Sequence, residues 1–169
     1  MCSQSSGEKG EFMNEYYVTN RDVIKDFSIN TGTSLSPTFT KLCTTSELTL
    51  GTDFDTQTWY VFCDAIQRSI KTGVAITIDG TVKIDINNSA ITKVLGDIKS
   101  LITTGAISQF NNQLVQFNLL TGVNSSVLQY TKLQANVSYS LESLGGNAED
   151  VGEFAISMTI NGTGTEVSA

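Results

Sequence analysis

The residue types that usually perform chemistry are sparse in this sequence. It contains no histidine, which excludes histidine-based triads, zinc sites with histidine ligands and the usual proton shuttle near pH 7. Its three cysteines, Cys2, Cys43 and Cys63, share no CxxC spacing, and a zinc site made of cysteine alone would need four. An odd, scattered set of cysteines also argues against a disulfide framework and favours folding in a reducing compartment.

Two acidic stretches could in principle bind a cation. Asp53 and Asp55 could form half of a Ca²⁺ site, but acids at the start of a helix are stabilising by about 0.3–1 kcal/mol each, so we favour a capping role. The stretch "NAEDVGE" lacks the alternating order of a calcium loop and is typical of a solvated turn. The glycines belong to no phosphate-binding motif. We therefore expect no catalytic residue, no cofactor and no metal site.

Composition and charge limit the class of partner. The chain has 169 residues, 40% of them apolar and 16% charged, which fits one globular domain. Its net charge is −7, and no basic residue follows Lys132. Wrapping nucleic acid needs clustered Lys and Arg, so that role is excluded, although a repulsive surface facing nucleic acid is not. No apolar stretch is long enough for a signal peptide or a membrane span, and we expect neither.

Abundant Thr, Val and Ile, with a single proline, favour strands over helices. One segment, about 56–72, has a different period. Its apolar residues recur at i, i+3, i+4, i+7 and i+11, which predicts one face of an α-helix: Trp59, Phe62, Cys63, Ile66 and Ile70. Asp55 or Thr56 would cap its start, and Gly73 would end it.

Strict alternation follows in "VAITIDGTVKIDI", where Asp79-Gly80 is either a two-residue hairpin turn or a bulge in one long strand. Residues 89–103 then carry a full apolar stripe, which predicts a second short helix with Ser89 as its cap and Gly105 as its stop. Three strand-like runs complete the chain.

The elements predict a mainly β (α+β), antiparallel domain with helices at about 56–72 and 89–103. We expect a flexible N-terminal segment (1–15), a single domain (16–164) and a C-terminal tail (165–169). Isolated proteins usually protect exposed strand edges with charge or proline, and here Pro37 is the only proline. Such edges are typical of a sheet that another subunit completes.

The order of these elements resembles the major tail tube proteins of long-tailed bacteriophages, most closely those with non-contractile tails that infect Gram-positive bacteria. The resemblance covers about residues 39–164. Its most specific pieces are the "WYVFCDAIQ" segment ahead of a strand and the closing segment "SLGGNAEDVGEFAISMTINGTG".

The resemblance implies that the domain is an antiparallel β-sandwich or rolled barrel with a flanking helix at about 56–72. It also implies a structural virion protein whose homo-hexameric rings stack into a tube for DNA ejection. It implies a location in the virion tail after assembly in the host cytoplasm. It also implies partners: a tape-measure protein, and tail terminator and distal tail proteins, with DNA passing through unbound. On this basis we expect contacts between subunits or rings at Phe12, Tyr16, Tyr17, Leu35, Pro37, Phe154, Ile156, Met158 and Ile160. We expect charges on the lumen or solvent face at Asp79, Asp85, Glu149, Asp150 and Glu153.

Three other functions stay open at this point. The tube protein of a contractile injection device or type VI secretion system would share the architecture. A carbohydrate- or protein-binding β-module is suggested by the abundance of Ser, Thr and Asn. An enzyme of unrecognised type is the least favoured, because histidine is missing.

Overall fold

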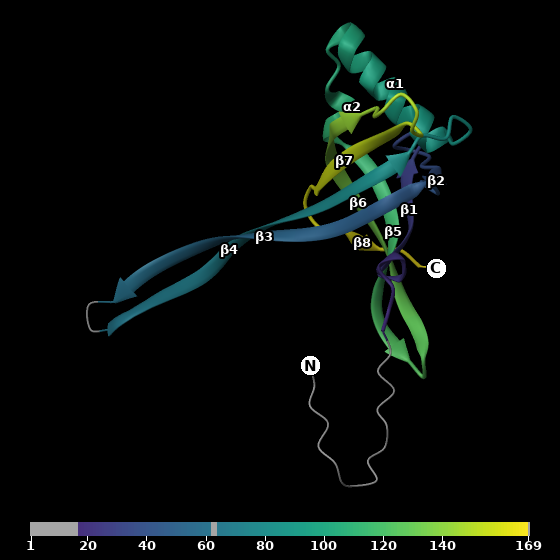
Figure 1. Ribbon diagram of the computed structural model, residues 1–169. Coiled ribbons are helices and arrows are strands. Elements are labelled where there is room, and N and C mark those ends of the chain that lie inside the picture. The colour runs from purple at the N-terminus through teal and green to yellow at the C-terminus, as the bar shows by residue number, and fades with distance from the viewer. Residues whose placement is uncertain (1–16, 62–63, 169) are drawn as a thin grey trace.

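The computed structural model describes residues 17–61 and 64–168. Eight strands, one α-helix of four turns and two short helical turns follow one another along the described chain (Figure 1). Their bounds are η1 Asn20–Asp22, β1 Ile24–Asn30, β2 Phe39–Lys41, β3 Thr45–Val61, β4 Asp64–Lys83, α1 Ser89–Thr104, α2 Ser108–Asn111, β5 Gln113–Asn124, β6 Val127–Leu144, β7 Glu153–Ile160 and β8 Thr165–Glu166.

One antiparallel sheet contains all eight strands. Its order is β2-β1-β5-β6-β7-β4-β3, and β8 pairs with β6 beyond the point where β7 ends. The sheet curls into a body with α1 over one end, and two hairpins project from it in different directions (Figure 1). The mainly β, antiparallel class expected from the sequence is confirmed.

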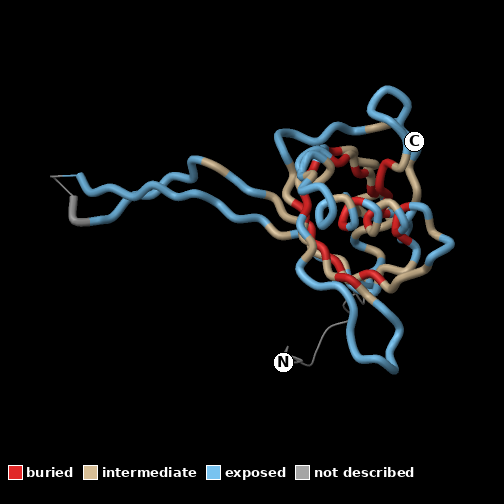
Figure 2. Tube along the Cα trace, turned by 90° about the horizontal axis from the view of Figure 1, so that it is seen from above, coloured by how far each residue is buried: buried red, intermediate tan, exposed pale blue. Residues whose placement is uncertain are grey.

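The core lies inside the curl of the sheet. Strands β5, β6 and β7 alternate between buried and partly buried residues, as expected of strands with one face packed inward. Helix α1 adds a buried stripe from its inner side: Ala90, Ile91, Val94 and Ile98. Burying each large apolar side chain contributes about 1.5–3 kcal/mol, so this cluster holds the body together. Figure 2 shows the buried residues gathered in the body and the hairpins exposed.

Helix α1 matches the helix predicted at 89–103 and begins with a side-chain cap. The cap is Asn88, whose Oδ1 accepts from the Ala90 N–H at 2.9 Å, in place of the expected Ser89. Gly105 ends the helix in a left-handed conformation, φ +69°, and its N–H donates to the Leu101 carbonyl. The cap also ties the helix to β2, because Asn88 Nδ2 donates to the Lys41 carbonyl at 2.8 Å.

The helix predicted at about 56–72 is wrong. Residues Thr45–Val61 and Asp64–Lys83 are instead the strands of one long hairpin, β3–β4. Pairs such as Trp59 with Arg68 lie directly opposite each other across it. Residues Phe62 and Cys63 of the predicted stripe lie outside the described residues. Asp55 and Thr56 sit inside β3, so they cap no helix.

Gly80 lies inside a single continuous strand. It pairs with Leu48 on one side and Ile156 on the other, with no turn and no change of register there. A Cβ atom at position 80 would lie 3.2 Å from the Glu47 carbonyl oxygen. This close approach of the neighbouring backbone favours glycine at the position.

We predict that Asn88→Ala lowers the free energy of unfolding by about 1 kcal/mol, because it leaves a helix N–H without its cap. Chemical denaturation of the two proteins measures the difference. The control is Ser89→Ala, since the Ser89 hydroxyl makes an exposed bond to Thr40 Oγ1 and no cap. Equal losses for the two variants would show that Asn88 is not the cap.

Candidate assembly surfaces

The β3–β4 hairpin extends far beyond the body. Strand β4 pairs with β7 only from Thr77 to Lys83, so residues 52–61 and 64–76 form a two-stranded ribbon (Figure 1). We call this ribbon the arm. At about 3.3 Å per residue it reaches roughly 30 Å from the sheet. An isolated two-stranded hairpin is at best marginally stable in water, so the arm is the part of the fold with the weakest internal support.

Large apolar side chains line the arm and are exposed. Trp59 is 44% exposed and Ile70 is 55% exposed, although both side chains would be expected inside a core. The other large apolar residues of the arm that are exposed are Phe54, Tyr60, Val61, Ile66 and Val74. A row of this kind on a protruding element is typical of an interaction surface.

The apolar residues of the arm change face at a bulge. Asp55 pairs with Gly73 but the next residue, Thr56, pairs with Lys71, so Thr72 is the extra residue. On the body side of the bulge, Phe54 and Val74 share the face that continues into the core. Beyond it, Trp59 and Ile70 lie on the other face of the arm. Side chains alternate between faces along each strand, and there the face that continues into the core carries Thr56 and Lys71.

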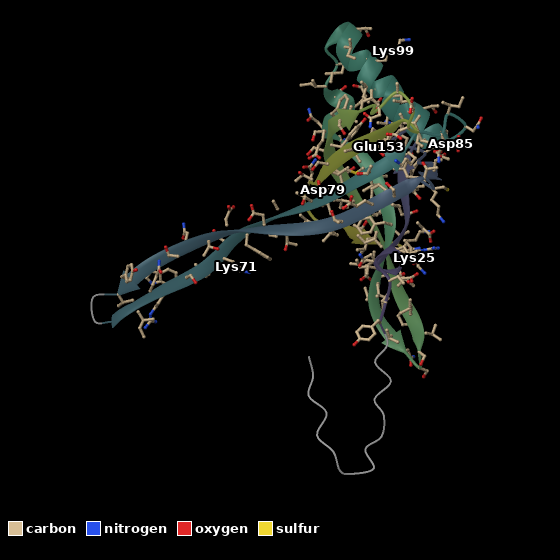
Figure 3. The ribbon with its side chains drawn as sticks, in the orientation of Figure 1. Lys25, Lys71, Asp79, Asp85, Lys99 and Glu153 are labelled. Carbon is tan, nitrogen blue, oxygen red and sulfur yellow. The ribbon has the colours of Figure 1, made fainter. Side chains whose placement is uncertain are left out.

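One cation covers part of the inner arm. The Lys71 ammonium lies 3.7 Å from the centre of the Phe54 ring, and Figure 3 shows this lysine on the arm. A contact of this kind contributes about 0.5–1 kcal/mol at an exposed site. It orders Phe54 but leaves its outer surface open.

A groove of about 870 Å³ lies between β1 and β3, next to the root of the arm. Apolar side chains contribute to its lining: Ile24, Phe27, Leu42, Leu48, Leu50 and Leu119. Within the described chain, no strand is paired with the side of β3 that faces this groove, so the sheet is open here. A groove between two strand edges is a suitable receptor for an extended segment.

The charges at the rim of the groove are largely paired. Lys41 binds Asp26, a residue with φ +57° at a bulge in β1, and Lys25 Nζ lies 2.9 Å from Asp22 Oδ1. The Lys41 ammonium holds the pKa of the Asp26 carboxyl below its ordinary value. Because these charges compensate one another, apolar side chains can enter the groove at a low electrostatic cost.

The outer face of the sheet is polar and rich in hydroxyl groups. On β4 and β7 it carries Thr77, Thr81 and Thr159, with Ser138 and Ser140 following on β6. Asp79 lies on this face and accepts a hydrogen bond from the Ser157 hydroxyl. Water solvates such a surface well, so it needs no apolar cover.

Comparison with known proteins gives the fold. No family model matches the sequence, and no curated protein matches it either. Several solved structures, in contrast, are similar to this chain. The tail of an empty GTA particle, obtained by helical refinement with C6 symmetry, aligns with a TM-score of 0.57 at 8% identity, covering 90% of this chain and 100% of that one. The chain has a tail-tube fold.

Two other structures share the tail-tube fold. The SPP1 tail tube aligns with a TM-score of 0.54 at 11% identity, over 86% of this chain and 76% of that chain. A chain from the virion of a native gene transfer agent aligns with a TM-score of 0.50 at 11% identity, over 85% and 96% of the two chains. At such low identity the likeness concerns the fold alone.

Burial contradicts part of the predicted contact set. Phe154, Ile156 and Met158 are at most 2% exposed and belong to the core, so they cannot touch another subunit. The reason is that β7 lies between β6 and β4, with these side chains on its inner face. Two of the remaining predicted contacts, Phe12 and Tyr16, lie outside the described residues. Three others are exposed: Tyr17, Leu35 and Pro37. Ile160 is half-buried at the end of β7.

The predicted acidic residues lie in different settings. Glu149 and Asp150 are exposed in the turn between β6 and β7. Glu153 forms an ion pair with Lys83 across the sheet, so its charge is compensated. Asp85 and Glu153 lie towards the end of the body that carries α1, whereas Asp79 lies nearer the arm (Figure 3).

A buried polar cluster under α1 was not predicted. Asp97 is 9% exposed, and its Oδ2 accepts from the Tyr139 hydroxyl at 2.6 Å and from Lys93 Nζ at 2.8 Å. Lys93 also donates to Gln113 Oε1 at 2.7 Å, and Gln113 Nε2 donates to the Asn30 carbonyl. Burial and the bond to Asp97 raise the pKa of Tyr139 well above its ordinary value. This cluster fixes α1 on β1, β5 and β6.

The described residues contain no group of three or more His, Cys, Asp or Glu side chains placed to hold a metal ion. None of the helices in the described chain is both long and apolar enough to cross a membrane.

We predict that Tyr139→Phe lowers the free energy of unfolding by about 1.5–3 kcal/mol, because the buried Asp97 carboxylate loses one of its two donors. The control is Tyr130→Phe, since the Tyr130 hydroxyl donates to a neutral acceptor, the Asp22 carbonyl, at a less buried site. Thermal and chemical denaturation measure both variants. Equal effects would contradict the role assigned to the cluster.

Proposed function

We propose that this chain is a structural subunit of a tail tube, in which copies form hexameric rings that stack around a passage for DNA. The observation that carries the proposal is the arm: a body with a tail-tube fold extends a ribbon with exposed Trp59 and Ile70 that its own core does not cover. Such a ribbon needs a partner that is always present to cover its apolar side chains. Another copy of the chain is a partner of this kind.

The polar outer face of the sheet supports a role as the wall of the passage. Hydroxyl groups dominate it around Asp79, and the ion pair between Lys83 and Glu153 adds no net charge. A wall with few cations has little attraction for phosphate, and the net charge of −7 repels DNA. We propose that this face lines the lumen, so that DNA passes without being held.

The finer assignments rest on the sequence resemblance. It favours a non-contractile tail of a phage of Gram-positive bacteria, with a tape-measure protein inside the tube and terminator and distal tail proteins at its ends. The division into an N-terminal segment (1–15), a domain (16–164) and a tail (165–169) stays a prediction. Within it, Thr165–Glu166 form β8 and pair with β6.

We predict that purified protein assembles into tubes with sixfold symmetry, and that the double variant Ile66→Thr with Ile70→Thr folds normally but does not assemble. Threonine keeps the β-branched shape and strand preference while removing apolar surface. Electron microscopy of negatively stained protein and sedimentation velocity measure assembly, and circular dichroism measures folding.

The matched control is Thr58→Ser with Ser69→Thr, a cross-strand pair on the other face of the arm. It should assemble like the parent chain. A parent chain that stays monomeric over a wide range of concentration would refute the proposed function. Normal tubes from the isoleucine variant would show that the arm is not an assembly surface.

A further inference from the structure

The open groove and the uncovered arm are different surfaces of the same chain. We propose that they fit each other: the outer half of the arm, with Trp59 and Ile70, occupies the groove between β1 and β3 of a second copy. The inference rests on the proposed function and deepens it, because it names the receptor for the arm.

The arm cannot fill the groove of its own copy. Strand β3 forms one wall of the groove with Leu48 and Leu50 and then leaves the body as the first strand of the arm. Trp59 lies nine residues beyond Leu50, so an extended strand carries it about 30 Å away. The groove that receives the arm must therefore belong to another copy.

The two surfaces are complementary in chemistry. The groove offers Ile24, Leu48, Leu119 and other aliphatic side chains, and its charged rim is already paired at Asp26 and Lys41. The outer arm offers one aromatic and several branched aliphatic side chains on an extended ribbon. Since β3 has no strand neighbour on the groove side within the described chain, an arm strand can also supply backbone hydrogen bonds there.

The pairing also has the correct symmetry for a tube. An arm that binds a groove makes a head-to-tail contact, because the two sides of the interface differ. Reciprocal exchange of arms between two copies would close a dimer, whereas contacts that all run in one direction do not close in this way. They leave one free arm and one free groove at the two ends of every partial assembly, so they propagate into rings or helical arrays. The similar GTA tail was obtained by helical refinement with C6 symmetry, and rings and helical arrays are the assemblies that one-directional contacts can build.

Cys43 provides a direct test, because it is free, exposed and part of the groove lining. The parent for the test carries Cys2→Ser and Cys63→Ser. Into it we would introduce Gln57→Cys, on the same face of the arm as Trp59 and opposite Ile70. Within one chain these two thiols are about 40 Å apart along the extended strand, so a short bismaleimide can join them only between copies.

After treatment of assembled protein with the bismaleimide, we expect a ladder of covalent multimers on a denaturing gel. The ladder should disappear with Cys43→Ser. It should be at least tenfold weaker when the probe is Val123→Cys, on the exposed tip of the β5–β6 hairpin, or when the protein is kept unassembled by Ile66→Thr with Ile70→Thr.

Two results would overturn the inference in distinguishable ways. Tubes that form normally but give no more multimer with Gln57→Cys than with Val123→Cys would show that the arm binds elsewhere, and the proposed function would stand. A second arm probe, Arg68→Cys, lies opposite Trp59 on the same face of the arm and guards against a poorly oriented thiol. Absence of a ladder with both probes is decisive. A parent chain that forms no tubes at all would refute the proposed function, and the inference with it.

Discussion

The structure depends on one constraint: a two-stranded ribbon cannot bury its own apolar side chains. Each strand of the arm has one partner, so one backbone edge of each strand and both faces lie open beyond the body. In a protein that works alone, Trp59 and Ile70 at such positions would weaken the fold and promote aggregation. In an assembly, the same exposed surface supplies the free energy of association.

The rest of the chain provides a rigid base for this ribbon. Strand β4 forms half of the arm and then enters the body, where it lies between β7 and β3. The core cluster, and Asp97 with its partners under α1, fix that base. The arm is therefore anchored in the best-packed part of the molecule, and its outer end has the least internal support. The conformational freedom of the chain is greatest at the surface that would bind a neighbour.

The sequence predicts best what local residues determine. Helix α1 follows from its own stripe and its stop at Gly105, and the strand pattern gives the β class. The arm could not be predicted from the sequence for two reasons. The chain reverses between Trp59 and Ile66, so apolar residues of two different strands follow one another in the sequence at a helix-like spacing. The bulge at Thr72 also shifts the alternation along β4. The usual expectation that large apolar residues lie in the core also fails for the arm, where Trp59 and Ile70 are exposed. The opposite holds for Phe154 and its neighbours on β7, which are expected at a subunit contact and instead belong to the core, because β7 lies between β6 and β4.

Trp59 allows the most direct test of this account, because it is the single tryptophan of the chain and lies on the outer arm. Its fluorescence can be followed together with light scattering while the protein concentration is raised. If copies of the chain cover the arm, the emission maximum moves to shorter wavelength in step with assembly. An emission maximum that keeps its solvent-exposed position while scattering rises would contradict the account.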